Sequence, residues 1–364
     1  MNRPLSPAPV PALTGSDLHL PLNFVAGGKP VWPEISRGDT ISIDATLLRD
    51  RCNDGFACWI LQTYVLMRQA GLDPTLSTLP RPDAVNVVHP FFFGLRHRGL
   101  AYILACRADA HEPWAANFWL DQNGARGEGP RHAAVPHWPQ PGLMPRDPRR
   151  GTRIETLVFK GEEINFDSRF RDPAFLAALG ELGVTLRLDV FGPGRAGPLS
   201  GPVFDWHDYT SADLVLAARN MTPADAAGKP ASKLVNAWLA GVPALLGPEP
   251  AFRELRRSEL DYAEIRTPAD VLAAVHRLKA EPDRYRAMIE TGRRRAADFT
   301  VARTLDRWLA ILNGPVRADF ERWQARGPLG KALRVGPDIL RDRLAKRAHL
   351  AEIRTGTRIL DFPT

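Results

Sequence analysis

Two series of alternating strand-like and helix-like segments, separated by a polar stretch, constrain the fold of this chain more than any other feature. Strands that are separated by helices or long crossovers pair in parallel, whereas antiparallel neighbours need only a short turn. The polar stretch, residues 117–152, is dense in Pro, Gly and Arg, which is typical of a domain boundary. The pattern therefore predicts an α/β protein with two domains, each built on a mainly parallel sheet.

The expected elements also give the expected domain limits. Residues 1–39 are rich in proline and have little periodicity, so we expect an extended or poorly ordered leader. Two domains are expected at 40–150 and 151–312, and a basic helical tail at 313–364. Strands are expected at 41–48, 74–79, 85–89, 101–107, 156–160, 184–191, 213–217, 242–247 and 262–265. Helices are expected at 57–70, 172–183, 231–240, 250–257, 268–279 and 282–312.

Composition and charge fit a globular protein with an affinity for anions. The chain has 364 residues, of which 44% are hydrophobic and 24% charged. The formal net charge is +7, and 11 Lys/Arg against 6 Asp/Glu from Pro315 onward place +5 of it in the last 50 residues. The simpler interpretation of that segment is a solvated helix, and the alternative is a patch that docks on an anionic membrane surface.

Cysteine usage and the N-terminal sequence bear on the compartment. The three cysteines match neither a zinc-ligand pattern nor a disulfide framework, which favours a reducing environment. The first residues lack the apolar core of a signal peptide. We therefore expect a cytoplasmic protein, with peripheral contact at the inner face of a membrane as the variant that the basic tail suggests.

The stretch FGPGRAG at 191–197 matches the G-x-G-x-x-G fingerprint of dinucleotide-binding folds, and Asp213 follows at about the spacing of the ribose-binding acid. In that fold the third glycine opens a helix whose amides bind the pyrophosphate. Pro198 and Pro202 interrupt any such helix, and a proline inside the fingerprint removes one of the amides. We interpret FGPGRAG as a loop at the end of a strand and expect no nicotinamide or flavin cofactor.

The run KPASKLVNAWLAGVP at 229–243 is more informative. Pro230 suits the first turn of a helix, and Gly241 followed by Pro ends it. Lys229 and Lys233 lie at the N-terminal end, where the helix dipole disfavours a cation by about 0.3–1 kcal/mol each. A helix start with free amides and two lysines is expected to bind a phosphate or diphosphate. The alternative is that both lysines are simply solvated.

These segments resemble the GT-B glycosyltransferases, in particular family-4-like enzymes. KPASKLVNAWLAGVPALLGPEPAFREL is similar to their donor-binding helix, loop and strand, which read K-P-x-x-K-x-x-E/N-A-x-x-x-G-x-P. DGFACWILQTYVLMRQAGLDPTL (54–76) resembles their N-terminal Gly loop, helix and second strand. VFKGEEIN, LRLDVFGPG and FDWHDYTSADLVLAARN follow in the order of the C-terminal domain. The resemblance spans about residues 40–312. It implies two Rossmann-like domains that face each other across a cleft.

The resemblance implies transfer of a glycosyl group from a nucleotide-sugar to a saccharide or glycolipid acceptor, with no further cofactor. Many relatives carry a pair of glutamates at two positions that hold Gly228 and Asn236 in this chain. The identity of the donor sugar therefore stays open. Lys229 and Lys233 would bind the diphosphate, and Asn236 the ribose hydroxyls. The other residues that the resemblance places near the donor are Gly55, Arg107, Gly161, Glu162 and Gly241.

The expected chemistry needs stabilisation of the departing diphosphate and, for inversion, a base. Enzymes that this chain resembles stabilise the leaving group with cations and helix amides, and the sequence has no Asp-x-Asp motif, so metal-independent transfer is expected. Trp138 could stack on an acceptor sugar or anchor a Pro-rich linker. The candidate catalytic residues, each of which could equally be a solvated loop side chain, are Asp54, Asp109, His111 and Glu112.

Two other functions remain open at this stage. A nucleotide-sugar epimerase of the same fold would need a carboxylate pair and a histidine in the cleft, and a non-catalytic nucleotide-sugar-binding subunit would explain the missing glutamates. Nucleic-acid binding is not expected, because the positive charge is concentrated in one tail and no nucleic-acid-binding module is recognisable.

Overall fold

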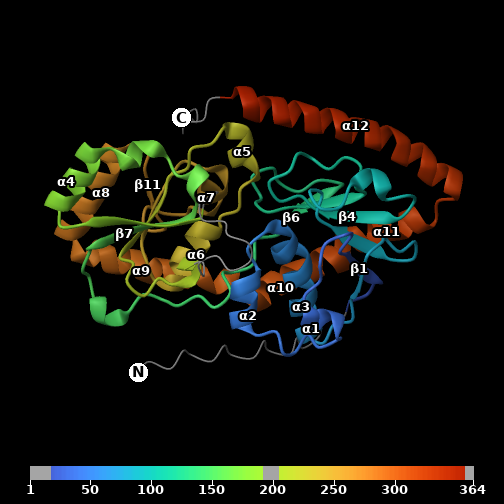
Figure 1. Ribbon diagram of the computed structural model, residues 1–364, viewed down its shortest axis with the longest axis horizontal. Coiled ribbons are helices and arrows are strands. Elements are labelled where there is room, and N and C mark those ends of the chain that lie inside the picture. The colour runs from blue at the N-terminus through green and yellow to red at the C-terminus, as the bar shows by residue number, and fades with distance from the viewer. Residues whose placement is uncertain (1–17, 192–204, 357–364) are drawn as a thin grey trace.

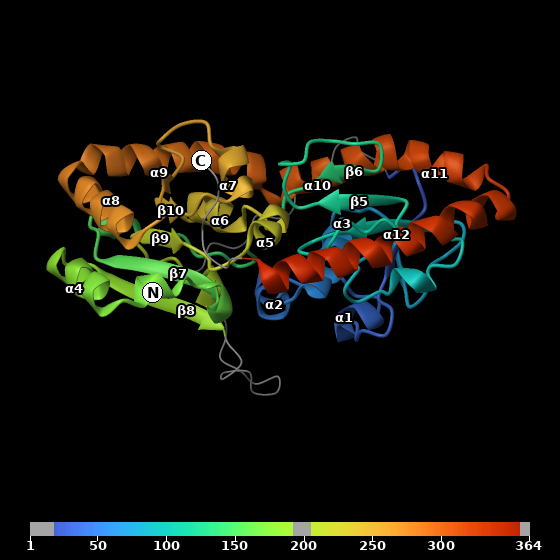
Figure 2. The same cartoon turned by 90° about the horizontal axis from the view of Figure 1, so that it is seen from above.

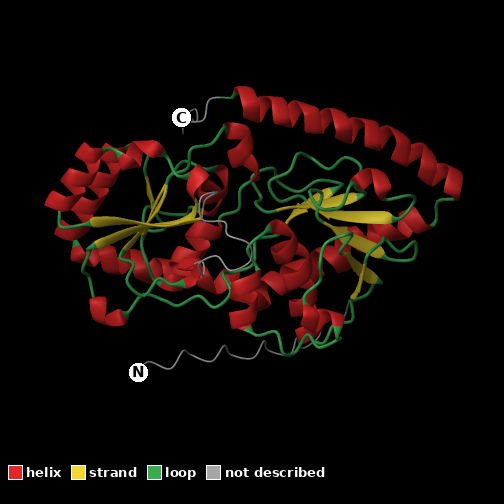
Figure 3. Ribbon diagram, in the orientation of Figure 1, coloured by secondary structure: helices red, strands yellow, loops and turns green. Residues whose placement is uncertain are grey.

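The computed structural model describes residues 18–191 and 205–356, which form two α/β domains side by side (Figure 1). Each domain has one sheet in its middle with helices on its faces (Figure 3). All strand pairs within both sheets are parallel. The two Rossmann-like domains predicted from the sequence are therefore confirmed.

The N-terminal sheet has six strands in the order β2-β1-β3-β4-β5-β6. Its strands are β1 (Leu22–Val25), β2 (Thr75–Ser77), β3 (Val85–Val88), β4 (Tyr102–Cys106), β5 (Phe118–Asp121) and β6 (His132–Ala134). β1 is fully buried between β2 and β3, so the expectation of a leader up to residue 39 is wrong for the described part of that segment. β5 and β6 lie in the stretch that the sequence suggested as a domain boundary, and they complete the sheet instead.

The helices of this domain begin earlier than expected. They are α1 (Pro33–Ser36), α2 (Ala45–Arg51), a π-helix (Ala57–Leu61) and α3 (Gln62–Gln69). Residues 41–48 were expected to form a strand because of their β-branched side chains. The carboxylate of Asp44 accepts the amides of Thr46 and Leu47 at 2.8 and 3.0 Å, which caps a helix at that point.

The C-terminal sheet has five strands in the order β11-β10-β9-β7-β8. They are β7 (Thr156–Glu162), β8 (Thr185–Phe191), β9 (Leu214–Ala217), β10 (Ala244–Leu246) and β11 (Ala263–Glu264). The helices are α4 (Pro173–Glu181), α5 (Pro223–Gly228), α6 (Ser232–Ala240), α7 (Pro250–Leu255), α8 (Pro268–Ala280) and α9 (Pro282–Ala296). Across both domains, short 3₁₀ turns are at 95–97, 148–150, 163–165, 168–171, 205–207 and 297–299. The five strands and the helices α4, α6, α7 and α8 agree with the sequence-based expectations to within a few residues. α5 was not expected, and the single helix expected at 282–312 is divided after α9.

After α9 the chain returns to the N-terminal domain. α10 (Val301–Ile311), a π-helix (Leu312–Val316) and α11 (Arg317–Gln324) run along the side of the N-terminal domain opposite α12 (Figure 2). Trp308, Phe320 and Trp323 are buried in the same core as Phe24. The Tyr102 hydroxyl donates to Asp319 at 3.0 Å. The first part of the expected tail is therefore a structural part of the N-terminal domain.

The last described element, α12 (Pro328–Thr355), runs along the outside of the N-terminal domain and ends beside α5 of the other domain (Figures 1 and 2). At its end, Gly356 lies against Thr222. Among residues 18–191 and 205–356, no helix combines the length and the hydropathy needed to cross a bilayer.

Candidate active site

The first turn of α6 carries Lys233, whose side chain turns back toward the end of β7. Its ammonium donates to the carbonyl of Lys160 and lies 4.6 Å from the ring centroid of Phe159. Burial lowers the pKa of Lys233 well below the usual 10.5, and the nearby Arg219 acts in the same direction. No side chain in the described part of the chain caps the start of α6. The Lys233 amine therefore lies between the first turn of α6 and the end of β7, and its binding of a phosphate stays a prediction.

Gly161, near the end of β7, provides the space for this lysine. A Cβ at this position would come within 2.6 Å of Lys233 Nζ, so any larger residue would displace the ammonium. Glu162 follows at the exposed strand end, accepts a hydrogen bond from Asn165 at 3.2 Å and favours the charged form of Lys233. The structure thus brings together Gly161, Glu162 and Lys233.

Lys229 connects the two domains. Its ammonium forms an ion pair with Asp109 of the N-terminal domain, with Nζ and Oδ2 2.7 Å apart. Gln122 Nε2 donates to the other Asp109 oxygen and to the carbonyl of Gly228, both at 2.6 Å. Asn123 Nδ2 donates to the carbonyls of Ala227 and Lys229 at 3.0 and 2.9 Å. The N-terminal domain therefore holds the loop before α6 by its backbone.

A cavity of about 180 Å³ lies at this junction. Gln122, Asn123 and His137 line it from the N-terminal domain, and Ser232 and Glu254 from the other. Polar side chains of both domains thus surround a space next to the first turn of α6. This is the location at which small-molecule sites between domains are usually found.

His89, which follows β3, is a site residue that the sequence analysis missed. Its Nδ1 accepts the amide of Phe91 at 3.3 Å, which assigns the proton of the neutral ring to Nε2. Burial lowers the pKa of His89 to about 4, although Asp54 and Asp109 act in the opposite direction, so the ring is neutral at pH 7. Among the described residues Nε2 has no hydrogen-bond partner.

Gly55 fits against the histidine. A Cβ on Gly55 would lie 2.5 Å from His89 Nε2, so only glycine is accommodated there. Asp54, a candidate base, uses Oδ1 to accept the amide of Ala57 at 2.8 Å and thereby begins the π-helix. Its position near His89 gives it an electrostatic role beside the site, whereas its geometry is that of a helix cap.

Glu249 is the second residue that the sequence analysis missed. It is fully buried in the turn between β10 and α7 and pairs with Arg219, with Nη1 and Oε2 3.0 Å apart. Burial raises the pKa of Glu249, while Arg219, Lys233 and Lys229 act to lower it. Its second oxygen has no hydrogen-bond partner in the described part of the chain. Only its position directly after a predicted strand could have indicated it.

Three candidates have partners elsewhere in the N-terminal domain. The guanidinium of Arg107 is buried and pairs with Asp121 at 2.7 Å, so its place is in the domain core. His111 Nε2 lies 3.3 Å from Asp342 of α12. Glu112 pairs with Arg126. The structure thus keeps Asp109 as the candidate base at the domain junction and directs the other loop residues away from it.

Three further expectations need correction or refinement. Trp138 is buried in the N-terminal core and donates from Nε1 to Thr63 at 2.9 Å, so it anchors the linker and cannot stack on a sugar. Gly241 has φ 68° and ends α6 at the opposite end from Lys233. Asn236 Oδ1 accepts the amide of Gln140 at 3.1 Å, which ties α6 to the linker; its ribose contact stays a prediction.

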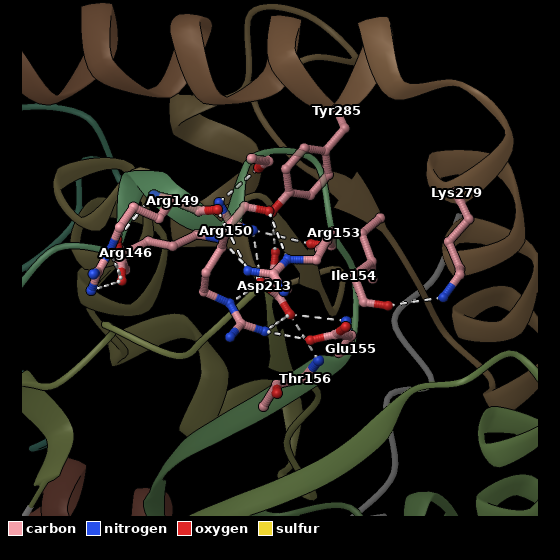
Figure 4. Close-up of polar contacts among 12 residues, drawn as sticks. Arg146, Arg149, Arg150, Arg153, Ile154, Glu155, Thr156, Asp213, Lys279 and Tyr285 are labelled. Carbon is pink, nitrogen blue, oxygen red and sulfur yellow. Dashed lines mark hydrogen bonds and ion pairs between the residues drawn. The ribbon is translucent and has the colours of Figure 1, made fainter.

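Asp213 has a structural role that explains its position. Its carboxylate is completely buried and accepts hydrogen bonds from Arg146, Arg150 and the amides of Glu155 and Thr156 (Figure 4). A ribose ligand is therefore excluded from this carboxylate. FGPGRAG after its first residue lies outside the described residues.

Cys52 and Cys58 form a cluster with His137 beside the cavity. The Cys58 thiol hydrogen-bonds to Cys52 and His137, which lowers the pKa of Cys58 to about 6 against the effect of burial. Cys58 in turn raises the pKa of His137, although burial opposes this shift. A Cys58 thiolate at neutral pH is the expected state of the cluster.

This state can be tested by titrating the ultraviolet absorbance of the thiolate. Because the pKa of Cys58 is lowered, the signal should be present at pH 7 and disappear as the pH falls through about 6. Cys58→Ser should abolish it. Cys106→Ser should not, because burial raises the pKa of Cys106. A signal that appears only above pH 8 would contradict the assignment.

Comparison with known proteins was made for sequence and fold. Residues 171–310 match the family model described as glycosyl transferase-like. AviGT4, a glycosyltransferase involved in avilamycin A biosynthesis, aligns over 82% of this chain and 98% of its own with 13% identity and a TM-score of 0.51. Anabaena HepE, solved with UDP and glucose, aligns over 81% and 100% with 11% identity and a TM-score of 0.50. The chain therefore has the GT-B fold, and its residues 171–310 are similar in sequence to the glycosyl transferase-like family.

Coverage differs among the GT-B structures. The chain covers 55% of TarM, at 10% identity and a TM-score of 0.44. A search of curated protein sequences gave no match. Within residues 18–191 and 205–356, no group of three or more His, Cys, Asp or Glu side chains is arranged to hold a metal ion. At these identities the comparison establishes the GT-B architecture, and the matched family model covers most of the C-terminal domain, which contains Lys229 and Lys233.

Proposed function

We propose that this protein is a glycosyltransferase that moves a sugar from a nucleoside diphosphate sugar to a saccharide or glycolipid acceptor. The observation that carries the proposal is the position of Lys233, Lys229 and the uncapped start of α6 at the junction of two parallel sheets. Cations and helix amides together favour a diphosphate. The GT-B fold and the glycosyl transferase-like match over residues 171–310 support the same reaction class.

In the proposed reaction, the bond between the sugar and the diphosphate breaks as the acceptor oxygen attacks. Negative charge develops on the leaving diphosphate, where Lys233, Lys229 and the α6 amides stabilise it. Preorganised donors of this kind contribute several kcal/mol to the transition state. We propose that these groups act without a divalent ion.

Asp109 and His89 have distinct proposed roles. The carboxylate of Asp109 is about half exposed and paired with Lys229, so a diphosphate that binds Lys229 would compete for this pair. The released carboxylate could then accept a proton from the acceptor hydroxyl. His89, which is buried with its Nε2 against Gly55, is proposed to position the Gly55 loop rather than to contact the sugar.

Thermal unfolding with UDP, GDP, TDP, CDP, CMP and NAD, each with magnesium or with EDTA, tests the donor class. A ligand at about 100 times its dissociation constant should add about 2.7 kcal/mol to stability. We expect one nucleoside diphosphate to stabilise the protein equally with magnesium and EDTA. Stabilisation by NAD alone, or only with magnesium, would contradict the proposal.

Turnover separates the transferase from the two other functions. A transferase releases free nucleoside diphosphate only when an acceptor is supplied, whereas an epimerase interconverts the donor alone and a binding subunit does neither. Asp109→Asn should keep nucleotide binding and reduce acceptor-dependent release, because the base would be lost.

A further inference from the structure

α12 has two chemically different faces. The inner face contacts the N-terminal domain: Asp338 pairs with Arg131 at 3.1 Å, and Asp342 accepts the amide of Ala115 at 3.4 Å. Val335 is buried in the N-terminal core. The two aspartates of the helix body are thus used to attach it to the protein.

The outer face is a leucine stripe. Leu329, Leu333, Leu340 and Leu344 are 74%, 69%, 60% and 56% exposed, and at 3.6 residues per turn they lie on one side of the helix. Leu350 is also exposed. Half of the large apolar side chains that are exposed in the described part of the chain therefore lie on this helix. Exposed apolar side chains gathered on one side of a helix mark an interaction site.

Basic side chains border the stripe. Arg343, Lys346 and Arg347 are exposed next to Leu340 and Leu344. Since both aspartates near them face the protein, the C-terminal half of the outer face combines exposed leucines with positive charge. This is the pattern of a helix that lies in the plane of a membrane interface.

We propose that the outer face of α12 docks on an anionic lipid bilayer, with the leucines in the acyl boundary and the basic residues at the headgroups. Charge favours this occupant over a second copy of the chain, because a two-fold contact through α12 would bring the same basic flank of each copy together. A basic flank is instead attracted to an anionic surface. The inference does not depend on the proposed enzymatic activity.

Sedimentation with vesicles, without any nucleotide or acceptor, tests this proposal. The full chain is incubated with vesicles of phosphatidylcholine alone or of phosphatidylcholine and phosphatidylglycerol. We expect binding to the anionic vesicles, weaker binding at high salt, and little binding to neutral vesicles. Equal binding to both vesicle types, or none to either, would overturn the proposal.

Substitutions on α12 test whether its outer face is the surface that binds the vesicles. Leu340→Asp combined with Leu344→Asp, and separately Arg343→Glu combined with Arg347→Glu, should each weaken vesicle binding at least tenfold. Leu176→Asp, at an exposed leucine of α4 in the other domain, is the matched control and should bind as the wild type does. Unfolding temperatures show that each variant is folded. Unchanged binding of the leucine variant, or a wild-type dimer that this variant dissociates, would overturn the proposal.

Discussion

Asp213→Ala is expected to lower the free energy of unfolding by about 3–5 kcal/mol, because it leaves buried guanidinium groups without their counter-ion. Asp213 is completely buried and binds Arg146 at 2.8 Å and Arg150 at 2.7 Å. It also accepts the amides of Glu155 and Thr156, so the loss removes the attachment of the linker to β9. A loss of this size should lower the unfolding temperature by roughly 6–20 °C.

Glu155→Gln is the matched control. Glu155 also pairs with Arg150, but its side chain is 54% exposed, so a change of less than about 1 kcal/mol is expected. Equal effects of the two substitutions would show that the buried pair does not hold the linker.

The pH dependence of stability follows from the carboxylate of Asp213. Burial alone would raise the pKa of Asp213, but Arg150, the backbone amides and Arg146 hold it below 3.8. Its contribution to stability is therefore complete above pH 3.8 and lost as the pH falls through its lower folded value. In acid unfolding below pH 4, the difference between wild type and Asp213→Ala should shrink.

Lys233→Ala is expected to weaken nucleoside diphosphate binding by about 10- to 100-fold, as loss of a charged hydrogen bond to phosphate would predict. The fold should remain as stable, because the ammonium donates to a backbone carbonyl rather than to a carboxylate. Isothermal titration calorimetry measures the affinity. Lys331→Ala in α12 removes the same charge far from the site and should leave the nucleoside diphosphate affinity unchanged. Unaltered affinity in Lys233→Ala would remove the central premise of the donor site.

The affinity should also depend on pH in a defined direction. The pKa of Lys233 is lowered by burial, and a bound diphosphate favours the charged form. Binding should therefore take up a proton and weaken as the pH rises above the lowered pKa. Lys233→Ala should lose this pH dependence.

The sequence predicted the second domain better than the first for local reasons. Pro173 begins α4 and Gly241 ends α6, so turn and cap residues identify these helices. β1 and β5 are four-residue strands buried on both faces, and such short apolar runs carry no periodicity that distinguishes them from other segments. Their place in the sheet depends on strands distant in sequence.

Candidate site residues could be proposed from the sequence where a local motif existed. Lys229 and Lys233 were singled out because charge at a helix start has a local physical meaning, and Gly161 was added through the family resemblance. His89 and Glu249 have no such signature, since each acquires its role from neighbours in other segments: Gly55 for the histidine and Arg219 for the glutamate. Arg107 and Trp138 were misplaced because the sequence does not show which side of a strand or linker faces the core.

The return of α10 and α11 to the first domain has a consequence for biosynthesis. Domains are generally completed in the order in which the ribosome releases them. Here the hydrophobic surface covered by Trp308, Phe320 and Trp323 stays open while the entire C-terminal domain is translated. The N-terminal domain is thus synthesised first but completes its core last. A nascent chain arrested before Trp308 would present that surface to chaperones.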